Sequence, residues 1–489
     1  MAQAKGILPK GDDKDVLYKN PQTGGYFIGV RLDTELNIDG ARVWLEAISS
    51  AIDTLVARLG PEQGGRAGTK VAAVAVGLAP TFFLAANGTA RFASLRPPAA
   101  FADSANRPLP NTFAPLASVP LLDWDVCFYV AATYEARVNG FLAALEKTRP
   151  TVQEIQMFRG YQREDGTEPF GYADGLRNIR TEERTERVFI HRDDRDIDEP
   201  EWADGGSYMA FLRIVQHPDQ FAALANDEAR DAVIGRKQDG TRLDLADQKV
   251  SPKEEPSNPP PSLPSGAHVG KVGPRGSHDD NQIFRRGLPF LETTDEGELR
   301  VGLNFCSFQA TLEQFDVVFN DWAMTAGFPP GENAAGAVDQ LLDPTRGLAT
   351  IEHVGFFFVP PYAEDGLAAA ILADPPDHRP AKTGRLIVHK RVLDPNDSSK
   401  RFERQGFRFQ VVDAQGNVLP NSEFETNSGG VGLCPAELTV GDSYTLQEIG
   451  TPPVENVALL SVPFTVDGPV VQLSVVNTVP SGTPYGGAA

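Results

Sequence analysis

The sequence predicts an α+β core followed by a small all-β domain, and three observations support this prediction. Apolar stretches typical of buried strands alternate with segments of helical periodicity through most of the chain. Beyond residue 384, short alternating strands follow one another with only turn signals between them. The proline-rich segment 374–383 separates the two regions and has the composition of a linker.

The elements of the predicted core are recognised by their periodicity. Continuous apolar runs predict buried strands, whereas apolar residues at spacings of three and four predict amphipathic helices. A helical run that ends at Gly235 is one example, because glycine commonly follows the last residue of a helix. The expected strands are 26–31, 71–78, 126–132, 207–215 and 303–310, and the other expected helices are 41–59, 133–147 and 311–325.

Two segments interrupt this alternation. Residues 180–201 are dense in charged side chains, which predicts an exposed excursion. Residues 251–265 are rich in proline and serine, which predicts a stiff, extended surface loop.

The C-terminal region is predicted to be a small β-sandwich. Its expected strands have the sequences RLIVHKRV, GFRFQVVD, SYTLQEI, PFTVD and VQLSVVN. The predicted organisation is a core domain at 1–373, a linker at 374–383, a β-sandwich at 384–479 and a flexible tail at 480–489.

Composition restricts the classes of protein that this chain can belong to. The formal charge of −21 argues against nucleic acid or an anionic membrane as a partner. No stretch reaches the roughly 18 apolar residues that a membrane span needs, and no leader is seen, so a cytoplasmic protein is the default expectation. The cysteines form no CxxC pair, so a cysteine-rich metal site is excluded, and all are expected to be buried thiols: Cys127, Cys306 and Cys434.

Two motifs carry the chemistry of the core. PFGYADGLRN, at 169–178, contains a GxxDG pattern that taken alone is also good turn chemistry. AHVGKVGPRGSHDDNQIFRRGLPF, at 267–290, contains two histidines and, downstream of them, a pair of adjacent arginines. A strand-like segment follows each motif: 205–216 comes after the first and 302–315 after the second. Spacing alone does not choose a ligand among the seven histidines.

In this combination and order, the motifs resemble those of the dye-decolourising peroxidases over roughly residues 20–360. The resemblance implies a core of two ferredoxin-like halves that binds one haem b per chain. It implies a haem-dependent peroxidase that reduces hydrogen peroxide and oxidises small organic one-electron donors such as dyes and phenols. A homo-oligomer is also expected.

Carried over by position, the resemblance assigns three residues. His268 matches the axial ligand of the haem iron, with His278 as its rival in an exposed polar turn. Asp174 and Arg285 match the catalytic pair on the peroxide side, and Arg285 is preferred over its neighbour Arg286 because of its place ahead of the GxPF turn.

The chemistry expected of these residues is consistent. Neutral imidazole is a strong ligand for ferric haem. One carboxylate can take the proton from peroxide and return it, and an arginine can offset developing negative charge. An acceptor on the far nitrogen of the histidine would raise its basicity, and Glu313 and Asp316 are both candidates.

Other features leave alternatives open. The acidic residues of the charged excursion suit Mn²⁺ as a further substrate, but a solvated charge run has the same composition. Bulky donors would require surface aromatics to relay electrons, although core positions suit tryptophan equally. The acidic residues are Glu182, Glu183, Asp193, Asp194, Asp196 and Asp198, and the tryptophans are Trp44, Trp124, Trp202 and Trp322.

Residues 384–479 resemble the Cna-B or SpaA-type domains of bacterial surface proteins, with a prealbumin-like sandwich fold. The resemblance implies an intramolecular isopeptide bond between Lys390 and Asn477, assisted by Glu448, and an unknown docking partner for the domain. Such a domain also makes export without a leader conceivable. The alternative functions are a haem-binding or adhesion protein without peroxidase turnover, and a haem enzyme resembling chlorite dismutases or deferrochelatases.

Overall fold

The computed structural model has two compact units. One comprises Met1–Met324 with Gly331–Asp374, and the other comprises Thr325–Pro330 with Pro375–Ala489. The residues described are 24–57, 72–85, 89–92, 95–101, 119–161, 163, 165–173, 176, 178–179, 183–191, 199–248, 250, 255, 263–264, 266–273, 281–294, 296–328, 337–361, 366–372, 383–393, 404–427, 429–439, 441–454, 457–466 and 470–479.

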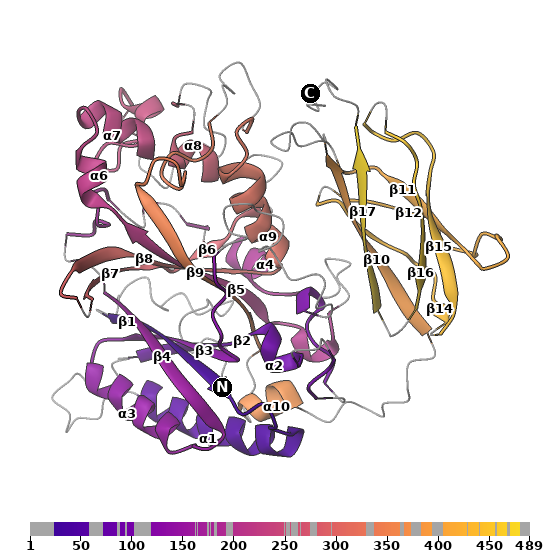
Figure 1. Cartoon of the computed structure of the whole chain (residues 1–489), viewed down its shortest axis with the longest axis horizontal. Coiled ribbons are helices and arrows are strands. Elements are labelled where there is room, and N and C mark those ends of the chain that lie inside the picture. The colour runs from indigo at the N-terminus through magenta and orange to yellow at the C-terminus, as the bar shows by residue number, and fades with distance from the viewer. Residues whose placement is uncertain are drawn as a thin grey trace. The chain divides into compact units, whose positions relative to one another are not determined.

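The first half of the core has the ferredoxin-like β-α-β-β-α-β pattern (Figure 1). Its strands form an antiparallel sheet in the order β4-β1-β3-β2. The elements are β1 (Gly24–Leu32), α1 (Ile38–Val56), β2 (Ala72–Leu78), β3 (Val126–Ala132), α3 (Glu135–Glu146) and β4 (Val152–Tyr161). The connection from β2 to β3 also contains α2 (Pro80–Phe83) and the short helix η2 (Ala99–Phe101).

The second half repeats this pattern with more helices. Its strand order is β9-β5-β8, and both β6 and β7 pair with β8. The elements are β5 (Ser207–Gln216), α6 (Pro218–Ala222), α7 (Asp227–Ile234), η5 (Leu243–Leu245), α8 (His268–Val272), β6 (Phe284–Arg285), β7 (Leu288–Thr293), β8 (Leu299–Gln309), α9 (Leu312–Asp316), the π-helix η8 (Val317–Ala323) and β9 (Ala349–Val359). Two short helices lie between the halves, α4 (Arg184–Val188) and η4 (Glu201–Ala203), and α10 (Leu367–Leu372) follows β9.

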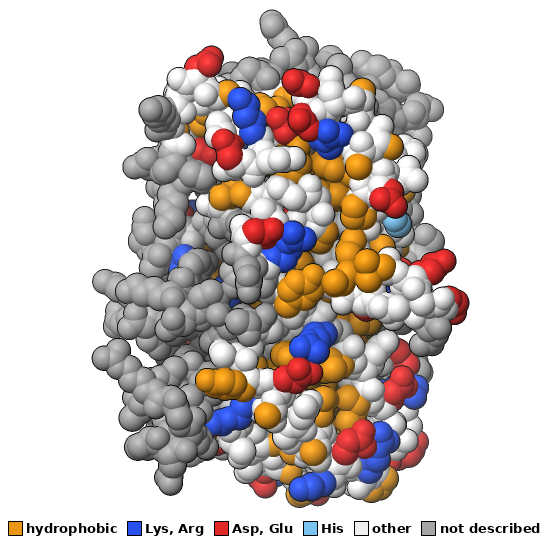
Figure 2. All heavy atoms as spheres, turned by 90° about the vertical axis from the view of Figure 1, so that its left-hand side faces the viewer, with side chains coloured by type: hydrophobic (Ala, Val, Ile, Leu, Met, Phe, Trp, Pro, Cys, Tyr) orange, Lys and Arg blue, Asp and Glu red, His pale blue; other side chains and the backbone are white. Residues whose placement is uncertain are grey.

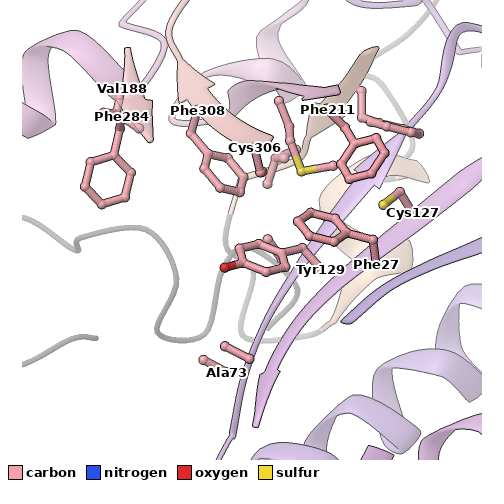
Figure 3. Close-up of a cluster of buried hydrophobic side chains, with 14 of the residues drawn as sticks. Phe27, Ala73, Cys127, Tyr129, Val188, Phe211, Phe284, Cys306 and Phe308 are labelled. Carbon is pink, nitrogen blue, oxygen red and sulfur yellow. The ribbon is translucent and has the colours of Figure 1, made fainter. Parts of the chain in front are cut away.

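The two halves share one hydrophobic core between their sheets (Figure 3). Within the nine-stranded sheet, β2 and β9 link the two halves, with Leu78 paired to Phe358. In the core, the ring of Phe27 lies 4.6 Å from that of Tyr129 in its own half and 4.6 Å from that of Phe211 in the other. The helices therefore cover the outer faces, with α1 and α3 on the first half and α6 to α9 on the second (Figure 1).

Local sequence explains why these elements form where they do. The side chain of Asn37 accepts a hydrogen bond from the Gly40 amide and caps α1. The apolar positions of α1 bury one face of the helix. The strand β3 is buried along its whole length, as expected for a continuous apolar run at the centre of a sheet.

The second unit is an all-β sandwich. One sheet has the order β13-β10-β14 with β17 also paired to β10, and the other has the order β12-β11-β15-β16. Side chains from both sheets form one buried cluster. The strands are β10 (Thr383–Leu393), β11 (Arg408–Val412), β12 (Phe424–Glu425), β13 (Val431–Leu433), β14 (Leu438–Thr439), β15 (Ser443–Ile449), β16 (Ser461–Thr465) and β17 (Val470–Thr478).

Two predictions from composition are wrong for the residues that can be described. Within the charged segment 180–201, Val188 and Ile190 are fully buried, because three consecutive apolar residues there contribute to the core. Within the proline-rich segment 251–265, Glu255 is also buried, because it pairs with Arg236. In both segments, single residues are buried although the composition of the segment as a whole is polar.

The surface of the core is of mixed character (Figure 2). On the face shown there, a band of apolar side chains runs between scattered basic and acidic groups, and the acidic side chains form no single patch on this face. Met157, Leu291 and Leu299 are exposed apolar residues on β4, β7 and β8. Among the described helices, none is both long and apolar enough to cross a membrane.

Candidate functional site

The first site is built around His268, at the start of α8. Its Nδ1 lies 2.7 Å from Oδ2 of Asp339, whose side chain is fully buried. The carboxylate of Asp339 also accepts a hydrogen bond of 2.9 Å from the Leu341 amide. A proton on Nδ1, donated to this carboxylate, leaves Nε2 with a free lone pair. Within the described residues, Nε2 has no hydrogen-bond partner, so it is available to an external group.

The histidine and its carboxylate are held together by the backbone. The Gln340 amide donates to the Gly266 carbonyl oxygen at 2.8 Å, and the Asp339 amide donates to Ala323 at the end of η8. Gly266 has φ = +75°, and a Cβ placed there would lie 2.6 Å from the Val338 carbonyl oxygen. Only glycine fits this approach of the two chain segments.

Replacing Gly266 by alanine is therefore expected to destabilise the core by more than the roughly 1–3 kcal/mol that an unfavourable φ alone costs. Gly297→Ala is the matched control, because Gly297 has a similar φ of +83° but nothing within 4 Å of the added Cβ. Urea unfolding of both variants measures the difference. Equal losses of stability would contradict the importance of the close approach.

The second part of the site is the strand β6 with Arg285. The Asn178 side chain forms two hydrogen bonds with the backbone of Arg285: its Nδ2 donates to the carbonyl oxygen at 2.8 Å, and its Oδ1 accepts from the amide at 3.1 Å. Asn178 ends the segment that contains the GxxDG pattern. Asn178 is thus fixed to the strand that carries Arg285.

Asp174 itself lies outside the described residues, as does the rival ligand His278. The residues around Asp174 are nevertheless held in place. The Ala173 amide donates to the Gln238 carbonyl oxygen at 3.2 Å, and Gly171 adopts φ = +87° in a turn whose amides are bound by Glu168. The described first part of the pattern, 171–173, is therefore held in a turn.

Strand alternation separates Arg285 from Arg286. Arg285 pairs with Ser307 of β8, whereas the preceding residue pairs with Phe308 in the core between the sheets. Arg285, which is exposed, and Ser307, which is buried, thus share the opposite face. Arg286 lies near Tyr129 on the core side: burial raises the pKa of this tyrosine to about 12, and the guanidinium opposes that shift. The alternation supports the choice of Arg285 over Arg286.

His268 belongs to the helices that cover this same face. Its helix α8 contacts η8, which continues from α9. Phe315 of α9 in turn contacts Phe305 of β8, with ring centroids 6.2 Å apart. The histidine is therefore carried by the helical layer and Arg285 by the strand layer beneath it, as two sides of one site would require.

The residue that sequence reasoning missed is Asp339. The partner of His268 was expected to be Glu313 or Asp316, and the structure shows that both candidates are wrong. Asp339 follows the histidine by 71 positions and has no local motif. Only the buried, amide-bound setting of its carboxylate distinguishes it, and that setting is visible only in the fold.

The remaining candidates have less to support them. Of the acidic residues considered for Mn²⁺, only Glu183 is described, and the described residues contain no cluster of three or more metal-ligating side chains. Trp44, Trp124 and Trp322 are buried, whereas Trp202 is partly exposed. All three cysteines are free and buried, as expected.

The second site lies inside the β-sandwich. Lys390 Nζ donates hydrogen bonds to Oε1 of Glu448 and to Oδ1 of Asn477, and all three side chains are buried. Asn477 Nδ2 donates to Oε2 of Glu448 at 2.8 Å and to the Ala458 carbonyl oxygen at 2.7 Å. The Lys390 ammonium also lies 4.4 Å from the ring centre of Phe407. Burial lowers the pKa of Lys390, and its bond to Glu448 opposes that shift.

Taken together, the fold and the first site define a duplicated ferredoxin-like α+β protein with a histidine–carboxylate pair in its helical layer and Arg285 on a strand of the second half. Residues 166–363 match the family model "Dyp-type peroxidase, C-terminal". This part of the chain is therefore similar to the C-terminal region of Dyp-type peroxidases.

The chain matches only part of the length of each curated protein of similar sequence. A deferrochelatase of Shigella flexneri is 26% identical over 203 residues, which are 39% of this chain and 48% of the relative. Peroxidase 2 of Mycetinis scorodonius is 23% identical over 275 residues, 44% of this chain and 54% of the relative. The chain thus spans about half the length of the curated relatives it matches.

The fold itself is shared with a solved structure. A DyP-type peroxidase from Streptomyces coelicolor superposes with a TM-score of 0.54 at 20% identity, over 72% of this chain and 93% of the other. This agreement confirms the predicted ferredoxin-like α+β core.

Proposed function

We propose that the protein is a haem-dependent peroxidase that reduces hydrogen peroxide and oxidises small organic donors of the dye or phenol type. The proposal rests mainly on the hydrogen bond between His268 and the buried Asp339. A histidine held in this way presents one ring nitrogen to a metal and keeps its tautomer fixed. The matches to Dyp-type peroxidases and to Peroxidase 2 support the same class of activity.

The residues present fit one haem b. His268 would hold the iron through Nε2, and Asp339 would make that nitrogen a stronger donor. The side chain of His268 is 27% exposed although its partner is fully buried, so part of the ring is accessible to a ligand. Phe305, Phe315 and Phe356 provide an apolar setting on the same helical side.

The haem, when bound, supplies the redox chemistry, and the protein supplies orientation and charge. Asp174 is proposed to take the proton that hydrogen peroxide loses and to pass it to the outer oxygen, which leaves as water. Arg285 is proposed to stabilise the negative charge that develops as the O–O bond breaks. The link from Asn178 to the Arg285 backbone would keep these two residues in register.

Replacing Arg285 by leucine tests this assignment. The haem-loaded variant is expected to keep its visible absorption spectrum but to react with hydrogen peroxide roughly a hundredfold to a thousandfold more slowly, as when another preorganised donor is lost. Stopped-flow absorption measures the rate. Arg286→Leu is the control, because Arg286 lies on the core side. A peroxide rate that falls in Arg286→Leu and not in Arg285→Leu would reverse the assignment.

A second candidate function is deferrochelatase activity, the release of iron from haem, because curated relatives carry that name. The two functions predict different products. Incubation of the haem-loaded protein with a reductant would yield metal-free porphyrin fluorescence for a deferrochelatase, and oxidised dye only with added peroxide for a peroxidase.

For the β-sandwich we propose an intramolecular isopeptide bond. The neutral Lys390 amine would attack Cγ of Asn477, a new amide bond would form, and the side-chain nitrogen of Asn477 would leave as ammonia. Glu448 bonds both reacting groups and is the proposed proton carrier between them. The bond would tie β10 to β17, which pair in parallel.

A further inference from the structure

Two side chains on β8 are buried without hydrogen-bond partners. Ser307 and Gln309 are both fully buried, yet neither the Ser307 hydroxyl nor either polar atom of the Gln309 amide has a partner in the described part of the chain. Such groups are rare in folded proteins, because each unmet buried polar group costs roughly 1–3 kcal/mol. Three of these atoms lie on the same strand, so β8 offers unmet hydrogen-bonding groups to a bound molecule.

The neighbouring strands do not supply partners. Across β5, Ser307 faces Ala210, which has no polar side-chain atom, and Gln309 faces Tyr208. The Tyr208 hydroxyl is already committed, because it donates to Glu199 at 2.6 Å and accepts from the Ala100 amide at 3.2 Å. The neighbouring side chains on β5 thus offer no free hydrogen-bonding group to Ser307 or Gln309.

Both residues lie on the face that carries Arg285. Cys306 and Phe308 point into the core between the sheets, so Ser307 and Gln309 point to the opposite, helix-covered face. Ser307 is the direct cross-strand partner of Arg285, and such partners have Cβ atoms about 5 Å apart. The two side chains therefore start from neighbouring positions on one face of the sheet.

We propose that Ser307 and Gln309 extend the peroxide site, holding hydrogen peroxide or the water that replaces it beside Arg285. Neutral hydroxyl and amide groups suit a small neutral molecule that both donates and accepts hydrogen bonds. A charged haem carboxylate would instead call for a basic partner at these positions. This inference rests on the proposed function and adds two binding residues to it.

The Ser307 hydroxyl is tested with fluoride, a small ligand of ferric haem that accepts hydrogen bonds. The haem-loaded Ser307→Ala variant is expected to bind sodium fluoride roughly threefold to tenfold more weakly than wild type, the effect of one lost hydrogen bond. Ser307→Thr keeps the hydroxyl and is expected to bind fluoride close to the wild-type level. Titration followed by visible absorption gives both constants.

Gln309 is tested by two measurements, the unfolding temperature without haem and the fluoride affinity with haem. Replacing a residue with a purely structural role would not raise the first and lower the second. Leucine in its place removes the unmet amide, so the haem-free Gln309→Leu variant is expected to unfold at a higher temperature than wild type. The same variant, loaded with haem, is expected to bind fluoride more weakly.

The outcomes separate this inference from the proposed function. Normal haem loading with unaltered fluoride binding in both Ser307→Ala and Gln309→Leu would overturn this inference alone. A Gln309→Leu variant that is less stable without haem would show a structural role for the amide and would also overturn it. A wild-type protein that takes up no haem would overturn both this inference and the proposed function.

Discussion

Alanine in place of His268 is expected to lower the affinity of the chain for haem by more than about a hundredfold, beyond the range for the loss of an outer partner. The reason is that His268 is the proposed iron ligand and its neighbour Asp339 has no ligand to orient once the ring is gone. Spectrophotometric titration of the haem-free protein with haem measures the affinity. Added imidazole is expected to restore part of the absorption spectrum, because it can occupy the space of the missing ring.

Two further variants define this expectation. His217→Ala is the control, since His217 is bonded to Thr350 by its Nε2 and has no proposed role. Asp339→Ala keeps the ligand but removes its acceptor, so haem affinity is expected to fall by about 10- to 100-fold. An unchanged haem affinity in His268→Ala would exclude this histidine as the ligand and direct attention to His278.

Removing Lys390 is the second large effect that we expect. The wild-type chain is predicted to have a mass lower than that calculated from its sequence by one molecule of ammonia, and Lys390→Ala is predicted to have its full calculated mass. Intact-protein mass spectrometry decides between these states. The variant also lacks the covalent link between β10 and β17, so the free energy of unfolding of the β-sandwich is expected to fall by roughly 2–5 kcal/mol, the range for removing a disulfide cross-link from a small domain.

Glu448→Gln is the informative companion to Lys390→Ala. It retains both Lys390 and Asn477 but replaces the carboxylate that bonds them, so the full mass is expected here too. Loss of ammonia in Glu448→Gln would show that the carboxylate is not needed. A wild-type chain with its full calculated mass would contradict the proposed bond.

Elements with strong periodicity could be predicted from the sequence. The strand expected at 126–132 is β3, and the helix expected at 41–59 corresponds to α1 at Ile38–Val56. The helix expected at 311–325 continues as the π-helix η8 after Asp316. Hydrophobic spacing does not distinguish these two kinds of helix well enough to predict the change.

Strands with weaker patterns were not predicted. β4 has a largely polar sequence and is mostly exposed, and β9 begins with exposed and partly buried residues before its buried end. Both owe their conformation to pairing with distant strands, β1 and β5, which a single sequence does not show.

For the candidate site, the sequence predicted which residues carry the chemistry but not the buried residues that surround them. His268 and Arg285 were found by resemblance, and strand alternation then supported Arg285 over Arg286. Asp339, Ser307 and Gln309 could not be found, because their significance is burial and the presence or absence of partners, which arise only when distant segments meet.

The most direct test of the central claim is the visible spectrum of the wild-type protein, loaded with haem, before and after one equivalent of hydrogen peroxide. We predict a strong haem absorption band that changes on addition of peroxide and returns when an organic donor such as a phenol is supplied. A protein that takes up no haem, or whose haem spectrum does not respond to peroxide, would contradict the proposed peroxidase function.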